Sequence, residues 1–348
     1  MSGLDRSSEV RRGEELSATA LREYLQNIVP EVRDGLEIRQ FPGGFSNLTY
    51  LLRAGDRELV LRRPPHGANI ASAHDMSREY RVLSALIDSF RRVPAPVHYC
   101  DDVSVIGTDF YLMKRLKGTI LRANQTEDVA ADADTMRKLS ESFIACLAEL
   151  HSIDPNTAGL RDLGRPEGYV TRQVAGWIRR YQSAATDVIP EMETTAIWLT
   201  DNLPSETATT LIHNDFKYDN LVLDIGNAAK IIGVLDWEMA TIGDPMMDLG
   251  SSLAYWAQAD DPPGLKNFSL TWLPGNYSRR KLINRYADLS GRNTDEVLFY
   301  YRFGLYKLAV ILQQIYARYR AGHTKDPRFA QLIEIVRVCA QQSLHEEV

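Results

Sequence analysis

The segment His213-Asn214-Asp215-Phe216-Lys217-Tyr218-Asp219-Asn220 decides the fold of this chain, together with the later segment Leu235-Asp236-Trp237-Glu238. Short apolar runs at 211–213, 221–223 and 231–235 flank both segments and predict strands. A His-x-Asp sequence alone is common and is usually an ordinary turn. Here an asparagine follows the aspartate and an apolar strand then leads into a second aspartate, which makes a chance match far less frequent.

These two segments supply the side chains that phosphoryl transfer requires, which are a group to align an acceptor hydroxyl, ligands for metal ions and positive charge near the phosphates. We assign catalytic roles to Asp215, which would orient the hydroxyl, and to Lys217, which would face the transferred group. Asn220 and Asp236 offer oxygens of the kind that Mg²⁺ prefers, and we expect them to bind the metal. His213 is interpreted as a buried scaffold residue.

Other residues near these segments receive smaller roles. Asp219 is interpreted as a solvated turn residue with no function. Asp248, which follows Gly243-Asp244-Pro245, is expected to anchor the backbone of the first segment from the start of a helix. The pair Tyr255-Trp256 and Trp272 are candidates to line an acceptor pocket, although aromatic residues at such spacing are more often part of a core.

A turn between two predicted strands near the N-terminus contains candidate phosphate-binding residues. They are Gly43, Gly44, Ser46 and Asn47. Paired glycines let a backbone pass close to a phosphate, and the two polar side chains add hydrogen-bond donors. The alternative is a plain hairpin.

An arginine at the end of a predicted strand is the candidate cation for the nucleotide phosphates. Arg62 ends this strand and Glu79 lies on the following helix, so we expect an ion pair that holds the guanidinium group near the α and β phosphates. A surface salt bridge is the alternative interpretation. Strand alternation points Arg63 to the opposite face, and the sequence alone does not decide which of the two arginines meets the phosphates.

The joint between the two parts of the chain is predicted to bind the nucleotide base. Met113 would pack beside an adenine ring, while backbone groups near Lys114 and Leu116 would pair with its edge. A plain linker would have a similar sequence.

The order of predicted elements indicates an α+β fold with two lobes. We expect strands at 36–41, 48–53 and 58–63, a helix at 77–86, two strand pieces around Gly107 within 105–115, and helices at 130–151, 170–184 and 191–203. The predicted division is an N-terminal lobe over 1–113, a hinge over 114–118 and a mostly helical C-terminal lobe over 119–348. A cleft between such lobes is a usual place for a ligand.

Composition excludes several classes of function. A formal charge of -6 and a pI near 5.7 argue against a nucleic-acid-binding surface. The three cysteines are scattered and suggest neither a disulfide framework nor a zinc site. No secretory signal and no apolar run of about 18 residues is visible. We therefore expect a cytoplasmic monomer or homodimer whose partner is a small-molecule hydroxyl acceptor, with no membrane or nucleic-acid partner.

Taken together, these residues resemble the aminoglycoside phosphotransferase and choline kinase-like family. The segment 213–220 is similar to its His-x-Asp-x-x-x-x-Asn pattern, 235–238 to its metal-binding aspartate segment, and 243–248 to the stretch that follows. This resemblance implies a bilobal protein-kinase-like fold, ATP as phosphoryl donor, and Mg²⁺ bound by Asn220 and Asp236.

A narrower resemblance comes from three N-terminal segments, 43–47, 60–65 and 77–83. They resemble the kinase-like domain found at the front of some acyl-CoA dehydrogenase family proteins. This implies an acceptor other than an antibiotic, such as a hydroxyacyl-CoA. The chain departs from the wider family at Arg62, where relatives have lysine, and the departure bears on nucleotide affinity and turnover.

The sequence therefore predicts an ATP-dependent and Mg²⁺-dependent phosphotransferase that acts on a small-molecule hydroxyl. Two alternatives stay open. Arg62 motivates a nucleotide-binding pseudokinase or scaffold with little catalysis. Asp215 and Asp236 also fit a metal-dependent hydrolase, although no histidine-rich ligand set accompanies them.

Overall fold

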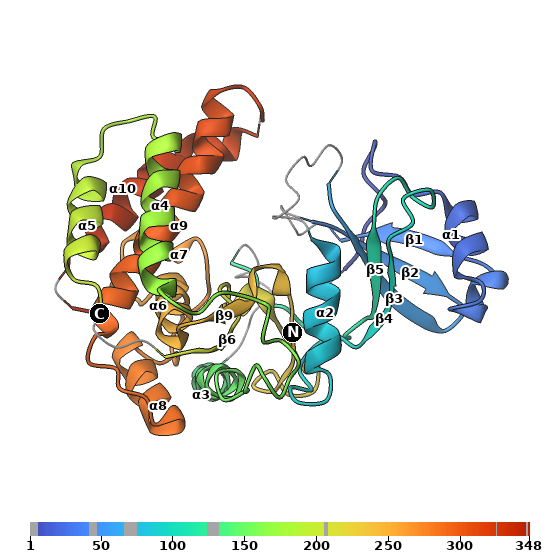
Figure 1. Cartoon of the computed structure of the whole chain (residues 1–348), viewed down its shortest axis with the longest axis horizontal. Helices are drawn as coiled ribbons and strands as arrows, with labels where there is room; N and C mark the ends of the chain where they lie inside the picture. Colours follow the sequence, from blue (N-terminus) through green and yellow to red (C-terminus); the bar gives the residue numbers. More distant parts are fainter. Residues whose placement is uncertain are drawn as a thin grey trace.

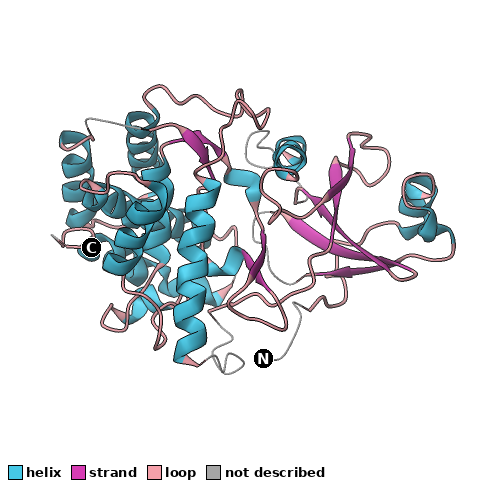
Figure 2. Cartoon of the chain, turned by 90° about the horizontal axis from the view of Figure 1, so that it is seen from below, coloured by secondary structure: helices cyan, strands magenta, loops and turns pink. Residues whose placement is uncertain are grey.

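The computed structural model has two lobes, one built on a β-sheet and one mostly helical (Figure 1). It describes residues 6–41, 47–65, 75–123, 132–204, 208–324, 326–345 and 347–348. Seen from below, the large sheet lies at one end and most helices at the other, with short strands between them (Figure 2). No helix within the described ranges combines the length and the apolar character needed to cross a lipid bilayer.

The N-terminal lobe is an antiparallel sheet with the strand order β1-β2-β3-β5-β4. Its strands are β1 (Glu37–Gln40), β2 (Leu48–Ala54), β3 (Arg57–Arg63), β4 (Pro96–Cys100) and β5 (Phe110–Lys114). Two longer helices belong to this lobe, α1 (Ala18–Leu25) and α2 (Met76–Leu86), and the 3-10 turn η1 (Pro30–Arg33) follows α1. The predicted three-stranded antiparallel arrangement of β1, β2 and β3 is confirmed.

Alternation along the strands places a helix on each face of this sheet. Leu61 packs with α1 in one apolar cluster, while Val60 and Met113 pack with α2 in another. Because successive side chains point to opposite faces, Arg62 shares the α2 face with Val60, whereas Arg63 lies on the α1 face. The register thus settles which arginine faces the second lobe.

The start of α2 is fixed by a side-chain cap. The carboxylate of Asp75 accepts a hydrogen bond from the backbone N–H of Arg78 at 2.9 Å, which satisfies one of the free donors of the first turn. Glu79 therefore lies in the first turn of the helix and is buried, with 1% of its surface exposed. The cap sets the rotation of α2 that aims Glu79 at the sheet.

The C-terminal lobe contains most of the helices and two short β-hairpins. The longer helices are α3 (Ala133–Leu150), α4 (Tyr169–Ala184), α5 (Pro190–Asp201), α6 (Pro245–Tyr255), α8 (Arg279–Ser290), α9 (Val297–Arg320) and α10 (Leu332–Gln342). The shorter elements are α7 (Pro263–Lys266), η2 (Tyr218–Asn220), η3 (Trp237–Met239) and η4 (Pro327–Gln331). Strand β6 (Thr210–Ile212) pairs with β9 (Thr241–Gly243), and β7 (Leu221–Leu223) pairs with β8 (Ile231–Val234).

Helices α6 and α9 cross at two glycines that allow close contact. A Cβ atom on Gly250 would lie 2.2 Å from the carbonyl oxygen of Tyr300, and one on Gly304 would lie 2.3 Å from the carbonyl oxygen of Gly250. No larger residue fits either position without moving a backbone. This contact holds α6, which carries Asp248, against the long central helix of the lobe.

One strand prediction is wrong. Of the two strand pieces expected within 105–115, the second forms as β5, but the first does not, because 103–108 is a turn in which Gly107 has φ +85° and its N–H donates to Val103 O. The missing strand is β4, which lies earlier, and its pairing partner β5 begins only at Phe110. Prolines flank Ala95, and proline argues against a strand in a sequence although it is tolerated in edge strands. The sequence therefore did not predict β4. β4 is indeed an edge strand.

The segment 260–275 contains the single-turn helix α7. The division into 1–113, 114–118 and 119–348 stays a prediction. Strand β5 ends at Lys114, and 115–117 form no helix or strand.

Candidate active site

The loop between β6 and β7 brings together three of the residues predicted for catalysis and metal binding. Asp215 accepts a hydrogen bond from Lys217 Nζ on Oδ1 at 2.9 Å. Asn220 Nδ2 donates to Asp215 Oδ2 at 2.9 Å and to the Asp215 backbone carbonyl at 2.8 Å. Since its nitrogen is engaged in this way, the amide of Asn220 has its oxygen left to offer a cation.

Asp248 holds the backbone of this loop from the first turn of α6. Its carboxylate accepts hydrogen bonds from the N–H groups of His213 at 2.6 Å and Asn214 at 2.8 Å, and it also contacts His151 Nε2 at 3.1 Å. Burial alone would raise the pKa of Asp248, but the hydrogen bond and charge of His151 lower it. The expected anchoring role of Asp248 is confirmed by these contacts.

His213 is fully buried and both of its ring nitrogens are engaged. Nε2 lies 3.0 Å from Leu235 O, and Nδ1 lies 3.3 Å from the Asp215 backbone nitrogen. Burial lowers the pKa of His213, which favours the neutral ring that donates from Nε2 and accepts at Nδ1. These contacts support its interpretation as a scaffold residue that links the two segments.

The hairpin of β7 and β8 places the second segment beside the first. Leu221 pairs with Val234, and the next hydrogen bond runs from Leu235 N–H to Asn220 O at 2.8 Å. Asp236, one residue further, therefore lies next to Asn220, and both line the same cavity. Residues that are distant in the sequence converge here because two short antiparallel strands end together.

Backbone strain is concentrated at this convergence. Among the described residues, two that are not glycine have positive φ, Asn214 at 66° and Asp236 at 67°. Each such conformation costs about 1–3 kcal/mol and persists where the surroundings impose it. Both residues adjoin or form the candidate site, a pattern that is typical of functional positions.

Arg62 connects the sheet to this site through an ion-pair cluster. Its guanidinium group lies 3.1 Å from Glu79 Oε1, 2.9 Å from Asp236 Oδ1 and 3.7 Å from Glu238 Oε2. Asn47 Nδ2 donates to Glu238 Oε2 at 2.6 Å. The expected pairing of Arg62 with Glu79 is present, and the guanidinium also contacts Asp236 directly.

This cluster contains three carboxylates and one guanidinium group. Burial raises the pKa of Glu79, whereas Arg62 lowers the pKa of Asp236 in spite of burial. Burial also works against the charge on Arg62, but Glu79 and the other carboxylates raise the pKa of Arg62 above its ordinary value. Lys217 adds to this lowering, so Asp236 stays ionised and can offer an oxygen atom to a cation.

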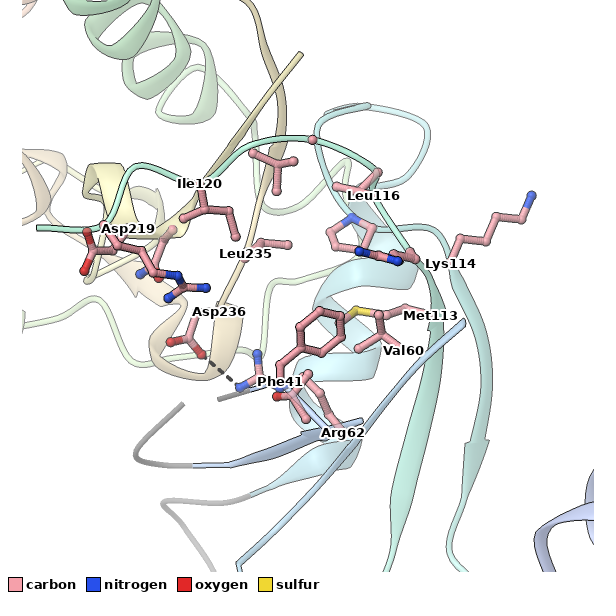
Figure 3. A pocket seen from close by; sticks show the side chains of 17 residues that line it. Phe41, Val60, Arg62, Met113, Lys114, Leu116, Ile120, Asp219, Leu235 and Asp236 are labelled. Atoms are coloured by element: carbon pink, nitrogen blue, oxygen red, sulfur yellow. Dashed lines mark hydrogen bonds and ion pairs between the residues drawn. The ribbon is translucent and has the colours of Figure 1, made fainter. Parts of the chain in front are cut away.

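A cavity of about 150 Å³ opens between the lobes beside Arg62 and Asp236 (Figure 3). Its apolar walls are formed by Val60, Met113, Ile120, Leu116, Val222 and Leu235. Its polar end is formed by Arg62, Asn220 and Asp236. An apolar slot that leads to charged groups suits a flat base with a phosphate tail.

The predicted hinge lines this cavity. The backbone N–H of Lys114 donates to Ala95 O at 2.8 Å and is therefore not free to pair with a base, contrary to the expectation for this residue. Within the described part of the chain, no hydrogen bond engages the N–H of Leu116. This N–H can therefore donate to the edge of a base. Beyond it, a Cβ on Gly118 would lie 2.3 Å from Leu223 O, so only glycine lets the chain pass so close.

Three predicted phosphate-binding residues, Gly43, Gly44 and Ser46, lie outside the described residues. Asn47 is described and is buried against Glu238. Phe41 and Thr49, on either side of this segment, both line the cavity.

The aromatic candidates for an acceptor pocket lie in different places. Tyr255 lies beside the catalytic loop, with Lys217 Nζ 4.6 Å from the centre of its ring. Trp256 is 2% exposed and packs on Phe143, and Trp272 packs against the core cluster. Of these three, Tyr255 lies nearest to the predicted chemistry.

A second cavity, of about 310 Å³, lies on the other side of the loop and contains residues that the sequence did not indicate. It is lined by Tyr169, Gln173, Trp177, Arg180, Asn214, Met239, Thr241, Met247, Phe303 and Lys307. Lys307 Nζ donates to Asn214 O at 2.7 Å, and burial lowers the pKa of Lys307. Arg180 stacks on Trp177 with 4.6 Å between the guanidinium carbon and the ring centre. The sequence signal that could have indicated this cavity is Lys307, a lysine among the apolar residues of α9.

The donor set of the first cavity fits Mg²⁺. Asn220 and Asp236 supply hard oxygen atoms, and the lowered pKa of Asp236 keeps its carboxylate ionised. Within the described ranges no group of three or more His, Cys, Asp or Glu side chains is arranged to hold a metal. Mg²⁺ commonly binds through one or two protein ligands and completes its shell with phosphate oxygens and water.

Comparison with known proteins agrees with this geometry. A model of the phosphotransferase enzyme family matches residues 37–283. The chain belongs to this phosphotransferase family. The predicted resemblance to the aminoglycoside phosphotransferase and choline kinase-like family is confirmed, and so is the predicted bilobal protein-kinase-like fold.

Curated relatives of this phosphotransferase family chain include acyl-CoA dehydrogenase family member 11 of Gallus gallus, which is 35% identical over 97% of this chain. Acyl-CoA dehydrogenase family member 10 of Mus musculus is 34% identical over 93% of the chain. The chain spans 44% and 30% of the lengths of these two relatives, so it matches less than half of each.

Solved structures show the same fold. A candidate aminoglycoside phosphotransferase of Ralstonia eutropha JMP134 superposes with a TM-score of 0.79 at 26% identity, and the match covers 94% of this chain and 98% of that protein. Choline kinase of Cryptosporidium parvum Iowa II superposes with a TM-score of 0.65 at 12% identity, covering 94% of each chain. The second likeness concerns the fold alone.

Proposed function

We propose that this protein is a nucleotide-dependent phosphotransferase that uses ATP and Mg²⁺ to phosphorylate a hydroxyl group of a small molecule. The observation that carries the proposal is the convergence of Asp215, Asn220, Asp236 and Arg62 from four separate segments at one cavity between the lobes. Each supplies a function that phosphoryl transfer needs.

Asp215 is the residue that orients the acceptor. Lys217 and Asn220 fix its carboxylate, so it presents a constant acceptor to a hydroxyl group. As the acceptor oxygen bonds to the γ-phosphorus, the bond from that phosphorus to the β-γ bridging oxygen breaks. Asp215 takes the hydroxyl proton late in this transfer, and the nucleoside diphosphate leaves.

Lys217 stays charged throughout. Burial alone would lower the pKa of Lys217, but the carboxylate of Asp215 raises it above its ordinary value. Its ammonium group therefore faces the γ-phosphoryl group as a permanent cation. Bound Mg²⁺, held by Asn220 and Asp236, supplies further neutralisation of phosphate charge.

Arg62 has a second task when a nucleotide binds. It forms ion pairs with Glu79 and Asp236 together. With Mg²⁺ bound by Asp236, the guanidinium group would keep its ion pair with Glu79 and would have other N–H groups to offer to the phosphates.

The acceptor, we further propose, carries negative charge. The second cavity adjoins Asn214 and is lined by Lys307 and Arg180, and no described carboxylate lines it. A groove between α4 and α9 shares Arg180 and adds Arg179 and Arg318. This arrangement is opposite to the acidic pocket that a polycationic antibiotic would favour.

A hydroxyacyl-CoA fits these features, because a hydroxyl near Asp215 and an acyl chain past Trp177 would leave the CoA phosphates near the three arginines. The names of the relatives associate them with acyl-CoA chemistry.

Coupled release of nucleoside diphosphate tests the function. The assay compares ATP and GTP as donors, since an aminoglycoside 2'-phosphotransferase of the same fold was solved with GDP. Acceptors are hydroxyacyl-CoAs of several chain lengths, choline and an aminoglycoside. We expect turnover with the CoA esters that Asp215→Asn and Asp236→Asn abolish. Equal turnover in all three proteins contradicts the proposal.

A nucleotide-binding pseudokinase is the second candidate, favoured by one observation. Arg62 stands where the wider family has lysine. Its guanidinium group forms an ion pair with Asp236, a proposed metal ligand. This candidate predicts thermal stabilisation by ATP without phosphorylated product for any acceptor. Product formation that depends on Asp215 excludes it.

A further inference from the structure

One buried lysine of the second cavity has contacts that point to a role more specific than charge alone. Lys307 is 5% exposed and lines the cavity together with Phe303, which lies one turn earlier on α9. Its Nζ atom donates a hydrogen bond to the carbonyl oxygen of Asn214 at 2.7 Å. Within the described part of the chain, no carboxylate forms an ion pair with this ammonium group.

The ammonium group of Lys307 has more donors than the protein uses. A lysine carries three N–H donors, and Asn214 O engages one of them. This contact supports the strained backbone of Asn214, where φ is 66°, but a neutral donor would serve that purpose too. A buried charge without an ionised partner is costly, and so is an unused buried donor. A ligand oxygen in the cavity would satisfy the remaining donors.

Lys307 lies close to the residue that orients the acceptor. Asn214, whose carbonyl oxygen it contacts, directly precedes Asp215. Burial lowers the pKa of Lys307, while the charges of Asp215 and Asp248 raise it, so both carboxylates are within electrostatic reach. An acceptor whose hydroxyl meets Asp215 would therefore place its next few atoms beside Lys307.

The lining of the cavity restricts the chemistry of those atoms. A carbonyl or carboxylate oxygen only accepts hydrogen bonds, so it matches an ammonium group, which only donates them. Trp177, Met247 and Phe303 supply apolar walls for a carbon chain attached to such an oxygen. Amino alcohols and polycationic sugars carry ammonium groups of their own, which Lys307 would repel.

We propose that Lys307 is a specificity-determining residue, which donates a hydrogen bond to an acyl oxygen of the acceptor a few bonds away from the hydroxyl that Asp215 orients. This inference rests on the proposed function, because it requires an acceptor in the second cavity. The acyl oxygen belongs either to a free carboxylate or to a thioester carbonyl, and the experiment separates these two sources.

Steady-state phosphorylation of two matched pairs of acceptors tests the proposal. One pair is a hydroxyacyl-CoA and the CoA thioether that has a methylene group in place of the carbonyl. The other is a hydroxycarboxylate and the alcohol that has a methyl group in place of the carboxylate. The wild type is expected to show at least about tenfold higher kcat/KM for the acyl member of one pair.

Lys307→Met is expected to remove this preference, by lowering kcat/KM for the acyl member to the level of its analogue. The analogue itself should change by less than about threefold, and KM for Mg-ATP should stay as in the wild type. Lys307→Gln, which keeps donors without the charge, should retain part of the preference. It keeps the test valid if the methionine variant does not fold.

A matched control is Lys281→Met, which removes an exposed lysine that lines neither cavity and is expected to behave as wild type. Equal kcat/KM of the wild type for both members of each pair overturns the inference and leaves the proposed function intact. A loss in Lys307→Met that is equal for both members of a pair also overturns it, and assigns Lys307 to support of the Asn214 backbone. Absence of nucleotide-dependent phosphorylation of every acceptor overturns both proposals.

Discussion

Two buried arginines of this protein, Arg279 and Arg62, differ in the number of carboxylates that their guanidinium groups contact. Arg279 forms a two-point ion pair with Asp261, at 2.5 and 2.8 Å, and both side chains are about 5% exposed or less. Arg62 faces three carboxylates at once, those of Glu79, Asp236 and Glu238. The first is a closed pair in which one charge cancels the other, and the second is an open cluster in which one guanidinium group contacts three carboxylates.

The difference separates structure from function. A balanced buried pair gains nothing from a further ion and is retained for the packing and orientation of its loop. The cluster around Arg62 lies at the end of a cavity, where Asp236 can also contact a ligand. We therefore expect changes to Arg279 and Asp261 to affect stability, and changes around Arg62 to affect catalysis.

The largest expected effect is on turnover when the open cluster loses Asp236. Asp236→Asn keeps the left-handed backbone conformation that asparagine tolerates but removes a hard metal ligand. We expect turnover to fall by about ten-thousandfold, which is about 5 kcal/mol in activation free energy, with the free energy of unfolding changed by less than about 1 kcal/mol. Steady-state kinetics and urea unfolding measure the two quantities. A variant with a clearly lower free energy of unfolding but unchanged turnover would contradict this prediction.

The closed pair predicts the reverse outcome. Asp261→Asn leaves Arg279 buried without a charged partner, so we expect a loss of about 3–5 kcal/mol in unfolding free energy. Turnover of the folded variant, measured at low temperature, should stay within about threefold of wild type. Asp260→Ala is the control, because this neighbouring carboxylate is exposed.

A third prediction concerns Asp248, which is balanced by hydrogen bonds in place of a cation. Asp248→Asn cannot accept from both His213 and Asn214 as the carboxylate does, and we expect a loss of about 2–3 kcal/mol in stability. Because the pKa of Asp248 is lowered in the folded protein, its contribution is present above its ordinary pKa of 3.8 and is lost as pH falls through the lowered value. The stability gap between wild type and variant should therefore shrink below about pH 4. A gap that grows in acid would contradict this account.

The smallest effect is expected from Arg62→Lys, which restores the residue of the wider family. A lysine keeps the positive charge but contacts fewer carboxylates at once, so we expect KM for Mg-ATP to change by about threefold and kcat to stay similar. Arg62→Met, which removes the charge, should raise KM by at least about tenfold. A large rise in kcat for Arg62→Lys would instead favour the pseudokinase candidate.

The sequence predicted the parts of the site that lie within one segment. Asp215, Lys217 and Asn220 are close along the chain, so their spacing alone brings them together. The lobes were also predictable, because strands and helices occupy separate parts of the sequence. The choice between Arg62 and Arg63 needed the register of β3, which a run of apolar residues does not fix.

Residues that act across long sequence separations were not predictable. Lys307 reaches the carbonyl of Asn214 from α9, and no local pattern connects the two positions. Glu238 stood in a recognised segment, but its contact with Asn47 depends on how the lobes meet. Asp219 has the composition of a surface turn, but its Oδ1 atom is buried and the residue lines the first cavity.

Calorimetric titration of ATP into the wild type and Asp236→Asn, each in the presence and absence of Mg²⁺, tests the central claim most directly. If Asn220 and Asp236 bind the metal, Mg²⁺ should strengthen ATP binding to the wild type by at least about tenfold and give little gain in the variant. An equal effect of Mg²⁺ on both proteins, or no association of Mg-ATP with the wild type, would contradict it.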